Sequence, residues 1–158
     1  MEPILKINNL QTHFFTKAGI LKAVDGVSFE IAAGEIVGLV GESGSGKSIT
    51  GFSVMGLVDP PGKIIDGNIN FKGKDLSALS NDQMQNIRGN RIAMIFQDPM
   101  MTLNPVLRIE TQMIEAIQAH DGSISREDAR IRSRDTLGLV GISSPDERLR
   151  AYPHQFSG

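Results

Sequence analysis

The chain has 158 residues, of which 40% are apolar and 22% charged, a composition that allows one globular domain with a hydrophobic core. Its 16 basic and 18 acidic residues give a formal net charge of −2, so the charge balance gives no sign of a nucleic-acid surface. Cysteine is absent, which excludes a disulfide framework and a thiolate metal site. The first residues are not those of a signal peptide. No apolar run approaches the roughly 20 residues of a membrane span, so any membrane role would come through a partner.

The N-terminal part of the chain is predicted to consist mainly of strands. Residues 4–7 and 10–15 are typical of short strands, and residues 27–31 alternate apolar and polar side chains, as a half-buried strand does. The apolar run over residues 35–40 predicts a buried parallel strand. Residues 48–57 hold no proline and are expected to form a helix.

A glycine-rich loop lies between that strand and that helix, and it is the strongest motif in the chain. Its sequence, Gly41-Glu42-Ser43-Gly44-Ser45-Gly46-Lys47-Ser48, fits the phosphate-binding pattern G-x-x-x-x-G-K-[ST]. The glycines permit a tight loop whose N–H groups point inward and bind polyphosphate oxygens, and the helix N-terminus faces the same anion. Lys47 adds a charge for the β- and γ-phosphates, and Ser48 is placed to ligate Mg²⁺. The alternative is a glycine-rich turn with an exposed lysine.

The middle of the chain continues the mixture of strands and helices. Residues 67–71 alternate as a strand does, and residues 72–74 predict a turn. Ser80, with Gln83 three residues later, predicts a capping box that starts a helix ending near Gly89. Residues 91–96 predict a second buried strand that ends at Gln97.

The last third of the chain is predicted to be helical. Residues 98–105 are expected to form a loop, followed by a helix over residues 109–120 whose apolar side chains have helical spacing. Ser125 and Asp128 predict the start of another helix, which runs towards Leu139 and Gly141.

Four segments together resemble the ATP-binding subunits of ATP-binding-cassette (ABC) transporters, in the branch that imports dipeptides and oligopeptides. They are the phosphate loop, Met94-Ile95-Phe96-Gln97-Asp98-Pro99, Leu103-Asn104-Pro105, and Tyr152-Pro153-His154-Gln155-Phe156-Ser157-Gly158. The resemblance covers essentially the whole chain. It implies an α/β P-loop NTPase core of ABC type, with an N-terminal antiparallel β subdomain and a helical subdomain. Residues 1–97 would form the N-terminal part of the ATP-binding core, and residues 98–158 the glutamine loop and helical subdomain.

The resemblance also implies roles for individual residues. Phe14 would stack on adenine, with Phe15 as the alternative. Gln97 would be a catalytic residue that reaches Mg²⁺ and the attacking water; the alternative is a polar residue that ends a strand. Ser157 and Gly158 would match the start of the signature motif Leu-Ser-Gly-Gly-Gln, with Phe156 in the Leu place, and that motif would bind the ATP of the opposite subunit. The implied nucleotide contacts are Phe14, Gly41, Ser43, Gly44, Ser45, Gly46, Lys47, Ser48, the backbone N–H of Ile49, Ser157 and Gly158, and the implied metal ligands are Ser48 and Gln97.

The family also needs an apolar strand that ends in Asp, a following Glu and a later His, and no convincing counterpart occurs in the sequence. We therefore expect an N-terminal fragment, cut within the signature motif, without useful ATP hydrolysis of its own. The full-length dimer would be a transport-coupled ATPase, peripheral on the cytoplasmic face of the inner membrane, that uses ATP and Mg²⁺ to power import of peptides or other small solutes. The alternative function is a non-transport P-loop ATPase or small kinase.

The implied partners are a second ATP-binding subunit, transmembrane permease subunits and, indirectly, an extracytoplasmic solute-binding protein, with no nucleic acid. Met100, Met101 and Leu103 form an apolar loop after Gln97, and methionines suit adaptable interfaces. In the family this region docks a short helix of the membrane subunit. The alternative is that these side chains pack inside the helical region.

Overall fold

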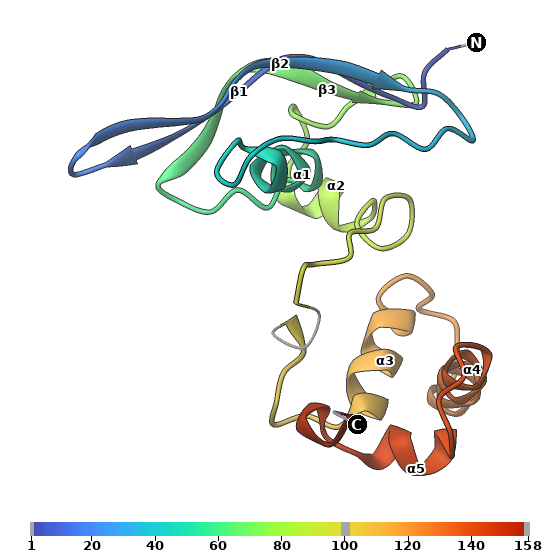
Figure 1. Cartoon of the computed structure of the whole chain (residues 1–158). Coiled ribbons are helices and arrows are strands. Elements are labelled where there is room, and N and C mark those ends of the chain that lie inside the picture. The colour runs from blue at the N-terminus through green and yellow to red at the C-terminus, as the bar shows by residue number, and fades with distance from the viewer. Residues whose placement is uncertain (1, 99–101, 157–158) are drawn as a thin grey trace. The chain divides into compact units, whose positions relative to one another are not determined.

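The computed structural model describes residues 2–98 and 102–156. The chain divides into two compact units, Met1–Met94 and Ile95–Gly158. Figure 1 shows the elements of each unit. The functional division expected between residues 97 and 98 stays a prediction.

The first unit is built on a four-stranded antiparallel sheet in the order β2-β1-β3-β4. The strands are β1 (Leu5–Thr16), β2 (Gly19–Ile31), β3 (Gly62–Phe71) and β4 (Lys74–Asp75).

The two short strands predicted within residues 4–15 are one continuous strand, β1. Ile7 and Leu10 are both fully buried although they lie three residues apart, because the register shifts between them and the shift reverses the in-out alternation. Asn9, with φ of 46°, lies at this irregularity. The apolar pattern of residues 4–15 is therefore interrupted near Asn9 and predicts two strands, whereas the pairing of β1 with β2 and β3 continues on both sides of this irregularity.

Two helices accompany the sheet. Helix α1 (Lys47–Met55) follows the glycine-rich loop as predicted and lies against one face of the sheet (Figure 1). Helix α2 (Asn81–Gln85) begins with the predicted capping box, in which the Gln83 N–H donates to Ser80 Oγ (3.3 Å) and the Ser80 N–H donates to Gln83 Oε1 (3.0 Å). The helix ends at Gln85 rather than near Gly89.

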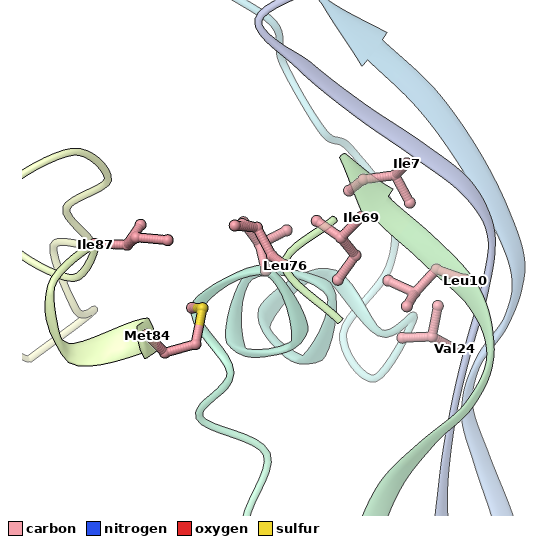
Figure 2. Close-up of a cluster of buried hydrophobic side chains, with 8 residues drawn as sticks. Ile7, Leu10, Val24, Ile69, Leu76, Met84 and Ile87 are labelled. Carbon is pink, nitrogen blue, oxygen red and sulfur yellow. The ribbon is translucent and has the colours of Figure 1, made fainter. Parts of the chain in front are cut away.

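The core of the first unit lies between the sheet and the segments that cover this face. Figure 2 shows side chains from three strands meeting those of the later segments. The fully or nearly buried members are Ile7, Leu10, Val24, Val54, Ile69, Leu76, Met84 and Ile87. Because β1, β2 and α1 all contribute to this cluster, the core fixes helix α1 against the strands beside it.

The two parallel strands predicted at residues 35–40 and 91–96 are not formed, and these predictions are wrong. Neither segment is assigned as a strand, and the isolated bridge between Arg88 and Ile92 is parallel but does not extend into a ladder. Ile36, Val40 and Ile95 are 99%, 90% and 91% exposed. A buried parallel strand needs neighbours that complete its hydrogen bonds and cover its faces, and within residues 2–98 and 102–156 no strand pairs with either segment.

The second unit is helical. Helices α3 (Ile109–Gln118) and α4 (Arg126–Leu139) confirm the two predicted helices, and Ser125 caps α4 by accepting from the Asp128 N–H at 3.0 Å. Helix α5 (Pro145–Arg150) and the 3-10 helix η2 (Pro153–Phe156) were not predicted. The hydrophobic cluster of the second unit is formed by Ile109, Leu137 and Leu149. Partly buried side chains pack against this cluster: Leu103, Met113, Ile142 and Phe156.

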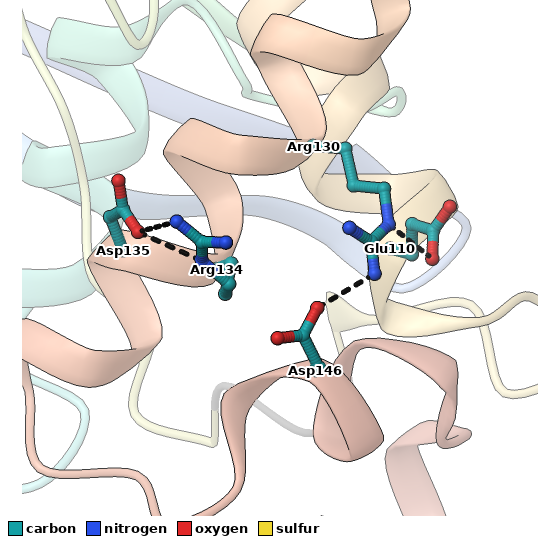
Figure 3. A network of polar contacts seen from close by, with 5 residues as sticks. All are labelled: Glu110, Arg130, Arg134, Asp135 and Asp146. Carbon is teal, nitrogen blue, oxygen red and sulfur yellow. Dashed lines mark hydrogen bonds and ion pairs between the residues drawn. The ribbon is translucent and has the colours of Figure 1, made fainter.

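A polar network ties the three helices together (Figure 3). Arg130 of α4 reaches Asp146 of α5 at 2.8 Å and Glu110 of α3 at 3.6 Å. The hydrogen bond that Arg130 donates to the Asp146 carboxylate raises the pKa of Arg130 above its ordinary value, so the guanidinium stays charged. Arg134, one turn later, pairs only with its neighbour Asp135 among the ion pairs of the described residues.

Candidate phosphate-binding site

The glycine-rich loop has the backbone geometry that its sequence predicts. Gly44 and Gly46 have φ of 83° and 89°, in the left-handed region that favours glycine. The Ser45 N–H donates to the Glu42 carbonyl at 3.2 Å, and the Thr50 N–H donates to the Gly46 carbonyl at 2.8 Å as helix α1 begins. The loop therefore turns directly into a helix N-terminus, the arrangement that binds anions.

Glycine is also required at position 46 because no room exists there for a side chain. A Cβ atom at this position would lie 2.2 Å from the carbonyl oxygen of Ala23 in β2. Strand and loop backbones thus approach each other as closely as glycine permits. This contact sets where the helix N-terminus stands relative to the sheet.

The Lys47 ammonium lies within the loop. Its Nζ donates to the carbonyls of Gly41 (2.8 Å) and Glu42 (2.7 Å) and to Ser45 Oγ (3.2 Å). An ammonium is a compact charge on a flexible stem, so the loop carbonyls hold it beside the N–H groups of the helix start. The positive charge of Lys47 and the positive end of the α1 dipole therefore both lie at the glycine-rich loop.

Ser48 and Ile49, the next two residues, face different surroundings. Ser48 is exposed and lines a pocket beside the loop. The side chain of Ile49 packs against the core of the first unit, which leaves its backbone N–H as the only polar donor it could offer a phosphate. Ser43 is exposed on the loop itself.

The pocket beside the loop has a volume of about 360 Å³, within the range of small-molecule sites. Residues 44–49 form one part of its lining, and the hairpin of β1 and β2 contributes Phe14, Leu21, Lys22 and Ala23. Phe14 lines the pocket, whereas Phe15 is 45% exposed and is not part of the lining. Apolar and aromatic surface thus lies beside an anion cradle, which suits a ligand with a flat ring and a phosphate chain.

Sequence reasoning missed the contributions of Leu21, Lys22 and Ala23. Phe14 and Leu21 are paired across β1 and β2, so the signal was the hairpin register rather than any motif. Lys22 Nζ lies 3.3 Å from Asp25 Oδ2, which partly balances its charge at the rim.

The remaining predicted site residues belong to the second unit or lie outside the described residues. Gln97 is exposed and belongs to the second unit, so its role stays a prediction. Ser157, Gly158, Met100 and Met101 lie outside the described residues. Leu103 packs against the hydrophobic cluster of the second unit, as the alternative for that loop expected.

Residues 2–98 and 102–156 contain no group of three or more His, Asp or Glu side chains placed to hold a metal ion. In the same ranges, no helix is long and apolar enough to cross a bilayer.

Comparison with protein families matches residues 24–158 to the ABC transporter family. The dipeptide transport ATP-binding protein DppD of Bacillus subtilis is 50% identical over the whole chain, and the oligopeptide transport ATP-binding protein AppD of the same organism is 48% identical. The chain spans 47% and 48% of those two proteins. Among solved structures, the ATP-binding cassette MJ0796, a dimer in a post-hydrolysis state bound to ADP and Pi, has a TM-score of 0.81 at 25% identity, over 97% of this chain and 63% of that one.

Proposed function

Because the chain belongs to the ABC transporter family, we propose that it supplies the ATP-binding site of a subunit that powers peptide import. The observation that carries this proposal is the pocket shared by Phe14 and the loop residues 44–49. One wall is aromatic and apolar, as a base needs, and the other combines N–H groups with an ammonium, as a triphosphate needs.

Each group of site residues would contact a different part of Mg-ATP. The N–H groups of the loop and of Ile49 would bind phosphate oxygens, Lys47 would contact the β- and γ-phosphates, and Phe14 would stack on adenine. Ser48 and Gln97 would hold Mg²⁺, since hydroxyl and amide oxygens suit a hard cation. When bound, the ion would neutralise charge on the β- and γ-oxygens. The exposed Ser48 hydroxyl beside the anion cradle fits this assignment.

The transport ATP-binding relatives and the dimeric cassette support a proposal about partners. We propose a second ATP-binding subunit, whose ATP would meet Ser157 and Gly158, and permease subunits that carry the peptide. An extracytoplasmic binding protein would deliver the solute to the permease. The subunit would lie on the cytoplasmic face of the inner membrane, where Gln97 would act during hydrolysis in the assembled dimer.

Peptide import is favoured over a small kinase or another P-loop ATPase. The relatives DppD and AppD, which match the chain from end to end, are transport ATP-binding proteins for dipeptides and oligopeptides. Their similarity extends through the helical second unit, far beyond the phosphate loop that many families share.

Nucleotide binding is tested by calorimetric titration of the chain with Mg-ATP. Replacing Lys47 with Ala removes charge-assisted hydrogen bonds and should cost about 1.5–3 kcal/mol, roughly a ten- to hundredfold loss of affinity. Equal affinities of the two proteins would remove the assignment of the site.

Transport is tested with a chimera in which this chain replaces the matching half of DppD from Bacillus subtilis. We expect the chimera to restore dipeptide uptake in cells that lack DppD, and the Lys47→Ala chimera to fail. ATP binding by the purified chimera serves as the folding control. A chimera that binds ATP but supports no uptake would contradict the import function and leave the nucleotide site intact.

A further inference from the structure

Gly62 begins strand β3 directly opposite Phe14 of β1. It is buried, and its φ lies outside the left-handed region in which glycine is favoured. The backbone therefore does not require glycine at this position.

Space is what requires it. A Cβ atom on Gly62 would lie 2.7 Å from Cε1 and 2.9 Å from Cζ of the Phe14 ring, and 2.7 Å from Cγ1 of Val58 on another side. All three distances are far shorter than the 3.5–4.0 Å separation of carbon atoms in contact. The Phe14 ring thus occupies the volume that any other residue at position 62 would fill.

The backbone around Gly62 is held in place. Its own N–H donates to the Asp59 carbonyl at 2.8 Å, and the N–H of Phe15 donates to the Pro61 carbonyl at 3.0 Å. The first bond closes the turn between α1 and β3, and the second fastens that turn to strand β1 next to Phe14. A methyl group at position 62 would therefore be accommodated by movement of the Phe14 ring and the Val58 side chain rather than of the turn's backbone.

We propose that Gly62 is a positioning residue for the nucleotide base: by lacking a side chain, it lets the Phe14 ring lie where it lines the pocket. This inference rests on the proposed function, because Phe14 is there the base-stacking residue. It adds that the turn after α1 sets the orientation of the ring and so controls the base half of the site.

The base half and the phosphate half can be tested separately. The phosphate loop is fixed by its own contacts, among them the approach of Gly46 to Ala23 and the bonds of Lys47 to the loop carbonyls. None of these involves Gly62. A methyl group at position 62 should therefore weaken the binding of a ligand with a base and spare a ligand that is phosphate alone.

The experiment compares ATP with inorganic tripolyphosphate by calorimetric titration of the 158-residue chain. Gly62→Ala should lower ATP affinity roughly five- to tenfold, which is about 1.0–1.4 kcal/mol and only part of the free energy of base stacking, and leave tripolyphosphate affinity within about twofold. Gly122→Ala is the matched control, because a Cβ there meets nothing within 4 Å. The double variant Phe14→Ala/Gly62→Ala should bind ATP no more weakly than Phe14→Ala alone.

Thermal unfolding gives a second readout that needs no ligand. Gly62→Ala should lower Tm when Phe14 is present and lower it less in the Phe14→Ala background, where the ring is gone. Unchanged ATP affinity, an equal loss of both ligands, or equal Tm losses in the two backgrounds would overturn the proposal. ATP binding that survives Lys47→Ala would instead remove the proposed function, which separates the two failures.

Discussion

Thr12 Oγ1 and Ser53 Oγ lie 2.8 Å apart in a buried contact between strand β1 and helix α1. Ser53 donates its hydroxyl proton to the Ile49 carbonyl at 2.7 Å, so in this arrangement Thr12 is the donor to Ser53. Phe14 follows Thr12 by two residues, and Lys47 begins the helix that carries Ser53. The bond therefore ties the strand of the aromatic wall to the helix of the phosphate cradle.

Removing one partner of this bond should be costly. Ser53→Ala leaves the Thr12 hydroxyl buried without its acceptor, and we expect a loss of about 1–3 kcal/mol in the free energy of unfolding. Thr12→Val should cost a similar amount. In the double variant the losses should fall short of additivity, because only one bond is removed. Urea unfolding followed by circular dichroism measures all three, and full additivity would show that the two hydroxyls are not coupled.

The two adjacent phenylalanines should differ in ATP binding. Phe14 lines the pocket and Phe15 does not, so Phe14→Ala should cost about 1–3 kcal/mol of binding free energy, while Phe15→Ala should change it little. Calorimetry with Mg-ATP measures both variants. A larger loss for Phe15→Ala would transfer the stacking role to that residue.

Leu103 and Val106 allow a matched comparison within one loop. Leu103 packs against the core of the second unit, whereas Val106 is 75% exposed. We expect Leu103→Ala to destabilise that unit by about 1–2 kcal/mol, less than a fully buried leucine, and Val106→Ala to have little effect. Tyr152 is the single tyrosine of a chain without tryptophan, so its fluorescence reports on this unit. Equal losses of stability for the two variants would instead favour the interpretation that Leu103 belongs to the surface that docks a helix of the membrane subunit.

Arg130 and Arg134 provide a second matched pair, on helix α4. Arg130 joins α4 to α3 and α5, whereas Arg134 pairs with the adjacent Asp135. Arg130→Met should therefore lower Tm of the second unit more than Arg134→Met does, and 1 M salt should narrow the difference by screening the ion pairs. Identical Tm values in low salt would show that the network adds nothing to the packing of the three helices.

The features that the sequence predicted well depend on neighbouring residues. The phosphate loop, the start of α1, the capping box at Ser80 and the cap of α4 at Ser125 each involve residues within a few positions of one another. The fold class, an α/β cassette core, is also confirmed, by the solved cassettes that match 97% and 98% of the chain. Helix α5 had a usable local signal that was overlooked: Pro145 at its first turn, followed by Asp146 and Glu147.

The features that were missed depend on residues far apart in the chain. Apolarity alone predicted strands at residues 35–40 and 91–96, but a strand also needs a paired neighbour. The pairing of Leu21 with Phe14 and the close approach of Gly62 to the same ring follow from sheet register, which no motif records. The phosphate half of the site was therefore readable as a motif, whereas the residues that surround Phe14 in the base half required the fold.

The open segment at residues 35–40 has a consequence for how molecules of this chain behave in concentrated solution. It is extended, holds no proline, and exposes Ile36 and Val40 almost completely. An extended apolar segment with unpaired backbone groups is a template for strands of other molecules. We expect the isolated chain to self-associate as its concentration rises. The highest concentration at which it stays monomeric should be set by these few residues rather than by its modest net charge.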